Sequence, residues 1–350
     1  MTGRETDGRP MLLPSLAGRV QVERVDSLHL RDNPLGDPSE RTVWVYLPEH
    51  YDRDRRRRYP VVYVLSGFAG TVPMWGNAMP FGLTFPEQID RWTAGAEERS
   101  CLVVFVDGWN SYGCSQYVDS PASGRYHSFL CEDVVSHIDR NFRTLAAREH
   151  RAVMGKSSGG FGALVSVMLR PDLFGAAASH AGDALYEHVY LPEFRRVLRT
   201  LRRYGGQAEA WLKDFGSGLV TDPDELPVLV ALGLAAAFSP DENGAPTLPF
   251  DPVTGPLRPD VWERWLAWDP VRMAPRYSHV WPDLLGLWID AGERDAYYLD
   301  IGATALRQAV LDAGLRPDAA AFEVVAGADH DSIRGRMLGS LTWLAERIAP

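Results

Sequence analysis

Short apolar runs separated by polar or glycine-containing segments recur along the chain. Residues 20–30 alternate partly, and residues 41–47 (RTVWVYL) alternate β-branched and aromatic side chains, which predicts two strands. Residues 59–65 and 101–106 are apolar at nearly every position, which indicates strands buried on both faces of a parallel sheet. From residue 126 to residue 142 the apolar positions recur at helical spacing.

The same alternation of strand and helix returns in the second half. Residues 152–154 are a short apolar run before a glycine-flanked serine, and residues 175–179 predict the next strand. Residues 284–290 and 321–325 predict two more strands, each followed by a helical pattern. Strands that alternate with helices predict an α/β protein with a mostly parallel central sheet flanked by helices.

Residues 184–280 break this rhythm. Residues 185–204 and 211–234 have helical patterns, and a segment dense in proline, glycine and aspartate follows. A long stretch of this kind inside a compact domain is typical of a lid or a binding insertion. We therefore expect a core in two parts, residues 1–183 and 281–350, with a largely helical cap between them.

A Gly-x-Ser-x-Gly sequence lies where a short apolar run passes into an Ala- and Leu-rich helical pattern. Such a strand-to-helix turn is the nucleophile elbow of the α/β-hydrolase fold, and it brings the residues two before and two after the serine into contact. With Ser157 as the nucleophile, those residues are Gly155 and Gly159. With Ser158 they would include Lys156, which does not fit, so the sequence favours Ser157.

A serine hydroxyl becomes a good nucleophile only when a base removes its proton, so Ser157 needs a histidine held by a carboxylate. The chain order in this fold is Ser, then Asp or Glu, then His, and His330 lies in a Gly- and Ala-rich loop before the closing helix. Asp290, Glu293 and Asp295 compete for the orienting role. Asp290 ends a strand, whereas Asp295 lies one short loop further on, within reach of His330, and we favour Asp295.

The tetrahedral intermediate of acyl transfer needs two backbone N–H donors. One is expected from Ser158, the residue after the nucleophile. The other is expected from the loop after an earlier strand, where Gly67 permits close approach and Phe68 supplies the N–H.

Aromatic residues near these loops are candidates for an acyl or aryl pocket, although packing in the core explains them equally well. The candidates are Trp75, Phe81, Phe85, Tyr112 and Tyr117. Within the insertion, Trp262, Trp265 and Trp268 either form the apolar underside of the cap or pack it onto the core.

Seven segments together resemble the esterase D / putative esterase family of α/β-hydrolases and occur in the family's order. They are VWVYLPEHY, RYPVVYVLSGFAG, VVFVDGW, YHSFLCEDVVSHIDRNF, VMGKSSGGFGAL, DAGERD and GADH. They span nearly the whole chain outside residues 184–280. The family includes S-formylglutathione hydrolases, feruloyl, acetylxylan and siderophore esterases, and mycolyltransferases.

The resemblance implies roles for individual residues. The family's elbow serine falls on Ser157, its acid on Asp295 and its histidine on His330, and the oxyanion loop falls on residues 66–68. Many members have His-Gly where this chain has Ser66 followed by glycine, so the neighbours of the oxyanion hole differ in this chain.

The resulting hypothesis is a serine carboxylic-ester hydrolase that acts on a small-molecule ester through an acyl-enzyme. An acyltransferase that uses the same three residues, with a sugar or alcohol in place of water, is the main alternative. A serine peptidase has no clear signature in this sequence, and the intact Ser157, Asp295 and His330 disfavour a non-catalytic binding module. The natural ester stays open.

Composition adds limits on partners. The chain is 45% hydrophobic and 23% charged, as in ordinary globular proteins, and its net charge of −10 argues against a nucleic-acid partner. The basic run at residues 53–58 is predicted to be a solvated loop. Cys101, Cys114 and Cys131 include no Cys-x-x-Cys pair, which disfavours a disulfide framework or a zinc site and indicates a reducing compartment. We expect no metal and no cofactor.

The N-terminal segment and the longest apolar run indicate where in the cell the protein is expected. The N-terminal segment has only a short apolar patch at residues 11–13, unlike a signal peptide. The longest apolar run, residues 228–238, falls short of the ~20 residues that span a bilayer. We therefore expect a soluble, cytoplasmic protein without a membrane span, and a homo-oligomer stays open.

Overall fold

A computed structural model describes residues 16–216, 220 and 222–350, so the apolar patch at residues 11–13 lies outside the described residues. Within these residues the main sheet has eight strands, which lie side by side in the order β1 (Arg19–Asp26), β2 (Glu40–Leu47), β4 (Leu102–Val106), β3 (Val61–Leu65), β7 (Arg151–Lys156), β8 (Ala176–His180), β9 (Gly286–Gly292) and β10 (Ala320–Val325). β2 is antiparallel to both β1 and β4, and every neighbouring pair from β4 to β10 is parallel. The predicted mostly parallel sheet is confirmed.

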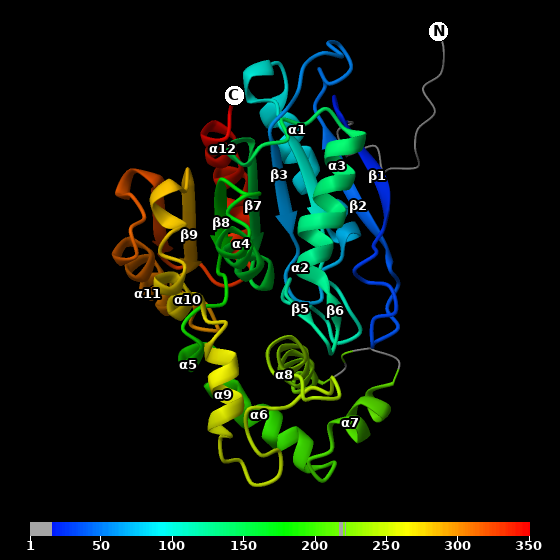
Figure 1. The fold of residues 1–350 in the computed structure, drawn as a ribbon, viewed down its shortest axis with the longest axis vertical. Helices are drawn as coiled ribbons and strands as arrows, with labels where there is room; N and C mark the ends of the chain where they lie inside the picture. The colour runs from blue at the N-terminus through cyan, green and yellow to red at the C-terminus, as the bar shows by residue number, and fades with distance from the viewer. Residues whose placement is uncertain (1–15, 217–219, 221) are drawn as a thin grey trace.

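Helices cover both faces of this sheet (Figure 1). One face packs against α1 (Phe85–Thr93) and α12 (Met337–Arg347). The other packs against α3 (Val135–Asn141), α4 (Ser158–Leu169), α10 (Pro270–Arg276) and α11 (Leu299–Asp312). All five residues of β3 are buried, because successive side chains of a strand point to opposite faces and both faces of this sheet are covered.

One predicted helix is irregular. The helical pattern of residues 126–142 corresponds to α2 (Tyr126–Ser128), a π-helical segment (Phe129–Val134) and α3. The wider π-helical turn holds an extra residue, and both Phe129 and Val134 remain buried. Residues 119–120 and 124–125 form a small separate hairpin, β5 (Asp119–Ser120) with β6 (Gly124–Arg125).

Between β8 and β9 the chain forms a group of helices that lies at the end of the molecule away from the C-terminus (Figure 1). They are α5 (Tyr186–Val189), α6 (Leu191–Arg202), α7 (Ala208–Phe215), α8 (Glu225–Phe238) and α9 (Pro259–Leu266), followed by α10. The two ends of this group meet at the buried Asp269. Its carboxylate accepts hydrogen bonds from the N–H groups of Leu185 at 2.9 Å and Tyr186 at 3.1 Å.

The three tryptophans of this segment pack its helices together. Trp265 is fully buried, with its ring centroid 5.7 Å from that of Phe194 and 6.0 Å from that of Trp262. Trp268 stacks on Phe238 at 6.0 Å. None of the three lines the cavity beside Ser157, so they do not form an apolar underside over it, and their ring contacts join helices of this segment to one another.

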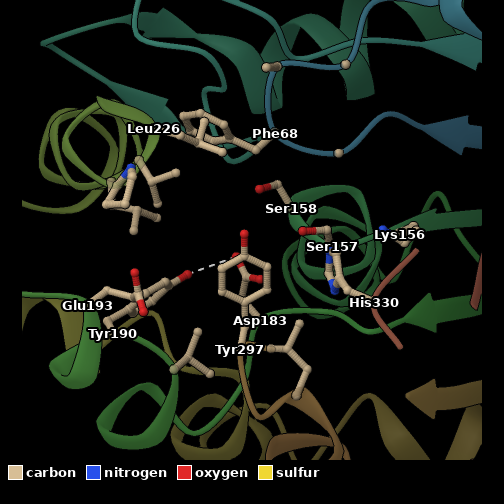
Figure 2. A pocket seen from close by; sticks show the side chains of 18 of the residues that line it. Phe68, Lys156, Ser157, Ser158, Asp183, Tyr190, Glu193, Leu226, Tyr297 and His330 are labelled. Atoms are coloured by element: carbon tan, nitrogen blue, oxygen red, sulfur yellow. Dashed lines mark hydrogen bonds between the residues drawn. The ribbon is translucent and has the colours of Figure 1, made fainter. Parts of the chain in front are cut away.

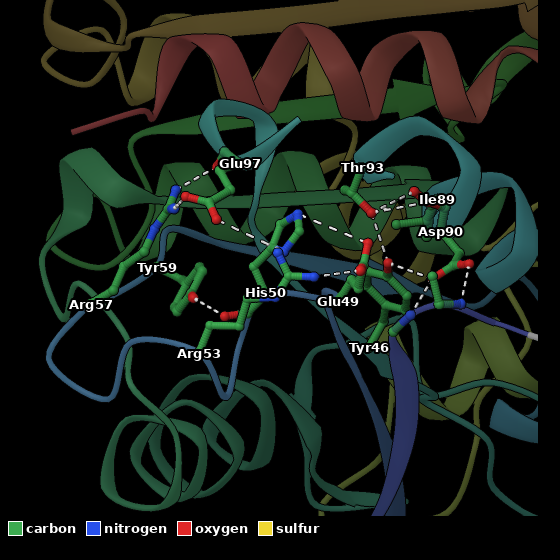
Figure 3. A network of polar contacts seen from close by, with 12 residues as sticks. Tyr46, Glu49, His50, Arg53, Arg57, Tyr59, Ile89, Asp90, Thr93 and Glu97 are labelled. Atoms are coloured by element: carbon green, nitrogen blue, oxygen red, sulfur yellow. Dashed lines mark hydrogen bonds and ion pairs between the residues drawn. The ribbon is translucent and has the colours of Figure 1, made fainter. Parts of the chain in front are cut away.

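The basic run at residues 53–58 forms a surface loop before β3 (Figure 3). Arg53 pairs with Glu49 at 2.7 Å and Arg57 with Glu97 at 3.3 Å. These exposed pairs neutralise part of the run and are worth little stability individually.

Three further observations concern chemistry elsewhere in the chain. Cys101, Cys114 and Cys131 are free, buried thiols. In the part of the chain that the structure describes, no cluster of three or more His, Cys, Asp or Glu side chains is arranged to hold a metal ion. No helix among those same residues combines the length and the apolar character that crossing a membrane requires.

Candidate active site

Ser157 occupies a strained turn between β7 and α4, with φ +58° and ψ −126°. A Cβ placed on Gly155 would lie 2.4 Å from the backbone of Gly159, and one placed on Gly159 would lie 2.3 Å from the carbonyl oxygen of Leu65. Only glycine fits at both positions. This is the steric demand by which the sequence favours Ser157 over Ser158.

His330 and Asp295 come together from two neighbouring loops, one after β10 and one after β9. His330 Nδ1 lies 2.8 Å from Asp295 Oδ2, and the Asp295 side chain is fully buried. Asp295 Oδ1 accepts a further hydrogen bond from the N–H of Tyr297 at 2.9 Å, which fixes the carboxylate. His330 and Ser157 line the same cavity, and Figure 2 shows the imidazole beside the serine hydroxyl.

The two competing acids are engaged elsewhere. Glu293 is exposed, and its Oε2 accepts a hydrogen bond from the N–H of Gly327 at 2.8 Å. Asp290 is buried and accepts a hydrogen bond from Arg336 Nε at 2.8 Å. Of the three candidate acids, therefore, Asp295 is the one that contacts His330.

A second set of serine, histidine and aspartate side chains lies inside the protein. His180 Nδ1 is 2.7 Å from Asp290 Oδ1, and His180 Nε2 is 2.6 Å from Ser340 Oγ. His180 and Ser340 are completely buried and do not line the cavity, so this set has no access to a substrate. It instead ties β8, β9 and α12 together beneath the cavity loops.

The loop at residues 66–70 lies against the elbow. A Cβ placed on Gly67 would lie 3.1 Å from the carbonyl oxygen of Lys156 and 3.5 Å from Ser157 Cβ. Phe68 lines the cavity, and its N–H donates no hydrogen bond to any other described residue. Ser158 is the first residue of α4, so its N–H has no acceptor within the helix. Neither N–H is therefore engaged by a described residue, and Gly67, the residue before Phe68, lies against Ser157.

Of the five aromatic residues predicted to line a pocket, the structure places one on the cavity wall. Trp75 lines the cavity, and its Nε1 donates to Ser66 Oγ at 3.2 Å. Phe85 is buried behind Trp75, with ring centroids 5.4 Å apart, and Phe81 is fully exposed.

The structure does not place Tyr112 and Tyr117 on the cavity wall, which corrects that part of the sequence prediction. Tyr117 is 1% exposed and lies behind the loop at residues 66–70, where its hydroxyl donates to the carbonyl oxygen of Ser66 at 2.8 Å. Tyr112 is half-buried and packs on the core. An aromatic residue in a loop is as readily turned inward for its buried area as outward toward a substrate.

A cavity of about 640 Å³ opens beside Ser157 (Figure 2). Phe68 and Trp75, from the segment after β3, line it together with Val197 of α6 and Leu226 of α8. This size and this largely apolar lining are typical of sites that enclose a small organic molecule.

Sequence reasoning missed the polar residues of this cavity. Asp183 is only 7% exposed, and its Oδ2 accepts a hydrogen bond from the hydroxyl of Tyr190 at 2.8 Å. Burial raises the pKa of Asp183 to about 6. Lys156, whose pKa is lowered by burial, lies 3.9 Å from Asp331. The one signal in the sequence is that Asp183 closely follows a strand, at the edge where parallel sheets bind ligands.

The sequence profile of the family described as "Putative esterase" matches residues 38–331. This chain belongs to that family. The resemblance seen in the sequence is confirmed, and the match runs through the segment between β8 and β9 as well as through the sheet.

Two curated relatives of this esterase-family chain match over part of its length. A stretch of 155 residues is 26% identical to an endo-1,4-β-xylanase/feruloyl esterase of Xylanibacter ruminicola and covers 43% of this chain and 20% of that protein. A stretch of 143 residues is 34% identical to an esterase of Mycobacterium tuberculosis and covers 41% of this chain and 29% of that protein. The chain therefore spans less than a third of either relative.

Solved structures agree along nearly the whole chain. A ferulic acid esterase superposes with a TM-score of 0.61 at 19% identity, covering 96% of this chain and all of that one. An S-formylglutathione hydrolase from Agrobacterium tumefaciens gives 0.58 at 17% identity, covering 96% and 97%. These likenesses confirm the predicted α/β-hydrolase fold.

Proposed function

We propose that this member of the family is a serine carboxylic-ester hydrolase with Ser157 as its nucleophile. One observation carries the proposal. Ser157, at its strained turn, shares a cavity with His330, whose Nδ1 lies 2.8 Å from the buried Asp295 carboxylate. Family membership and the free N–H groups of Phe68 and Ser158 support the same chemistry.

The mechanism follows from these positions. Asp295 accepts the Nδ1–H of His330, which leaves the lone pair on Nε2 available as a base. Nε2 takes the proton of Ser157 as Oγ attacks the ester carbonyl carbon, and the oxyanion is held by backbone N–H donors of Phe68 and Ser158. Collapse breaks the bond to the alcohol, which leaves with the proton from Nε2. Water, activated by His330 in the same way, then attacks the acyl-enzyme and releases the acid.

We further propose that residues 184–280 act as a cap-like insertion between core parts 1–183 and 281–350. α6 and α8 supply the cavity wall that faces the sheet loops, so the insertion would set which acyl and alcohol groups fit. The same acyl-enzyme could be passed to an alcohol in place of water. Product analysis with added alcohols separates an acyltransferase from a hydrolase.

The test compares the two adjacent serines in hydrolysis of p-nitrophenyl esters from acetate to decanoate. We expect Ser157→Ala to lower kcat by at least about 10⁴-fold, because the attacking oxygen is removed. Ser158→Ala should stay within about tenfold of wild type, because only the backbone N–H of that residue is used.

A fluorophosphonate followed by peptide mass spectrometry gives an independent readout. Label on Ser157 is the expected result. Ester turnover that survives Ser157→Ala in a pure preparation, or label on Ser158 instead, would contradict the assignment.

A further inference from the structure

Asp183 is an unusual residue to find in a largely apolar cavity. It lies just beyond β8, the strand paired with the nucleophile strand β7, and it is 7% exposed. Its Oδ2 accepts the hydroxyl of Tyr190, but no described residue donates a hydrogen bond to Oδ1. A buried carboxylate with an unpaired oxygen is unfavourable unless something else supplies a donor.

No described cation forms an ion pair with this carboxylate. Among the described residues, no Lys, Arg or His nitrogen lies within 4.0 Å of the Asp183 oxygens. Lys156 lies 3.9 Å from Asp331, and His330 is bonded to Asp295. The charge of Asp183 is therefore left facing the cavity.

The position of Asp183 connects it to the reacting atoms. Asp183, Ser157 and His330 all line the same cavity, and Figure 2 shows Asp183 between Ser157 and Tyr190. Glu193 also lines the cavity, but it already pairs with Arg196 at 3.2 Å. Asp183 is thus a cavity carboxylate beside the nucleophile that forms no ion pair, while Leu226 and Val197 offer only apolar contacts.

We propose that Asp183 recognises a hydrogen-bond-donating group, a hydroxyl or a protonated amine, that the ester substrate carries close to its carbonyl carbon. This proposal rests on the proposed function of Ser157 and names the class of ester that the site selects. The substrate's donor group would hydrogen-bond to Oδ1, and the rest of the substrate would contact the apolar walls. An ester of the same shape without the donor would leave Oδ1 buried and unpaired.

Matched esters test this without knowledge of the natural substrate. For the acyl half, ethyl 3-methylbutanoate, ethyl 3-hydroxybutanoate and ethyl 3-aminobutanoate place a methyl, hydroxyl or ammonium group at one position. For the alcohol half, propyl and 2-hydroxyethyl butanoate form one pair, and 3-methylbutyl and 2-(dimethylamino)ethyl butanoate form another. The readout is the ratio of kcat/KM for the donor ester to that for its apolar match, measured by titration of released acid.

In at least one half we expect a ratio of about tenfold or more, the scale of one hydrogen bond to a charged group. Asp183→Leu, which removes both oxygens at similar volume, should bring that ratio to about one or below. Asp183→Asn keeps a neutral acceptor, so it should retain a preference for a hydroxyl and lose a preference for an ammonium group. Glu193→Gln is the matched control and should keep the wild-type ratio.

The ratio compares two substrates on one sample, so a partly unfolded variant does not distort it. A preference for the hydroxyl or for the ammonium ester identifies which donor the site takes. Ratios near one in both halves of wild-type protein, or a preference that survives Asp183→Leu, would overturn the proposal. Loss of all turnover in Ser157→Ala together with ratios near one would leave the proposed function standing and this inference refuted.

Discussion

Asp295 and Glu293 stand two residues apart on one loop, yet only the Asp295 carboxylate meets the ring of His330. The consequence is a sharp difference between two conservative variants. We expect Asp295→Asn to lower kcat by roughly 10³–10⁴-fold, because an amide can hold the imidazole in the wrong tautomer and cannot stabilise the imidazolium. Glu293→Gln should stay within about threefold of wild type in the p-nitrophenyl ester assay. The opposite order would assign the acid to Glu293.

Asp183 also predicts a pH effect on selectivity. Burial is the dominant influence on its carboxyl and raises its pKa to about 6; titratable groups that also interact with it are Tyr190, His330, Asp295, Lys156 and Tyr297. As the pH falls through about 6 the carboxylate gains a proton, so any preference for an ammonium ester should fade there. Effects that change the turnover of both esters alike cancel from the ratio. A ratio that stays constant from pH 8 to about pH 5 would show that Asp183 is not the group involved.

The same shift predicts a stability effect. The pKa of Asp183 is higher in the folded protein than its ordinary value of 3.8, so the folded state binds the proton more tightly and the residue's stability contribution is lost as the pH rises from about 4 to about 6. Asp183→Asn keeps an acceptor for Tyr190 and removes the charge. We expect it to stabilise the fold by roughly 1–3 kcal/mol at pH 7.5 and by little at pH 4.

Thermal unfolding at the two pH values measures this difference. A variant that is equally or less stable than wild type at pH 7.5 would show that other contacts compensate the carboxylate. A cavity residue that makes the fold less stable than a simple substitution would is commonly one that serves binding.

At the scale of elements, α8 and the loop after β3 both line the cavity and lie close to each other, since a Cβ placed on Gly233 of α8 would be 3.2 Å from the Phe68 ring. Leu226 of α8 and Phe68 both line the cavity, and Figure 2 shows both side chains there. Leu226→Trp should fill part of the 640 Å³ and shift the p-nitrophenyl ester optimum toward shorter chains, lowering kcat/KM for decanoate by about tenfold or more. Acetate turnover serves as the internal control. An unchanged chain-length profile would place the acyl group away from α8.

The parts of this architecture that sequence can predict are those set by local pattern. The eight strands follow from apolar runs, and Ser157, Asp295 and His330 can be found because each follows a strand whose carboxyl end meets the others at one edge. Asp183 and Tyr190 escape such reasoning because their meeting depends on how α5 and α6 fold back on the sheet. Periodicity does not encode that packing.

Side-chain direction is equally hidden. Tyr117 lies in a loop with left-handed φ of +53°, and its ring lies in the core behind the loop at residues 66–70. The residues next to Tyr117 in the sequence do not predict the direction of its ring. The π-helical segment within residues 126–142 is also invisible in the sequence, because an extra residue in one turn leaves the average apolar spacing nearly unchanged.

At the scale of the whole molecule, the three cysteines give a simple check on the packing. Cys101, Cys114 and Cys131 are at most 3% exposed, and burial raises the pKa of each thiol to about 12. The thiolate is the reactive form, so none should react readily with Ellman's reagent in the native protein, and all three should react after addition of guanidinium chloride. Fast reaction of any thiol in the native protein would show that the core opens locally at that cysteine.

The two ends of the segment between β8 and β9 meet at Asp269, so the segment can change its substrate selectivity without moving the sheet. The segment between β8 and β9 leaves the sheet and returns to it at Asp269, and α8 also packs on Phe161 of the core, so we expect the part beyond these contacts to vary in length and sequence while the strands before Ser157, Asp295 and His330 keep their spacing. We therefore expect that this segment can be exchanged as one unit between members of the family. A graft of residues 186–268 from another member of the family, with Asp269 retained, should transfer the donor's preference among acyl chains and leave the bond-breaking chemistry to the recipient.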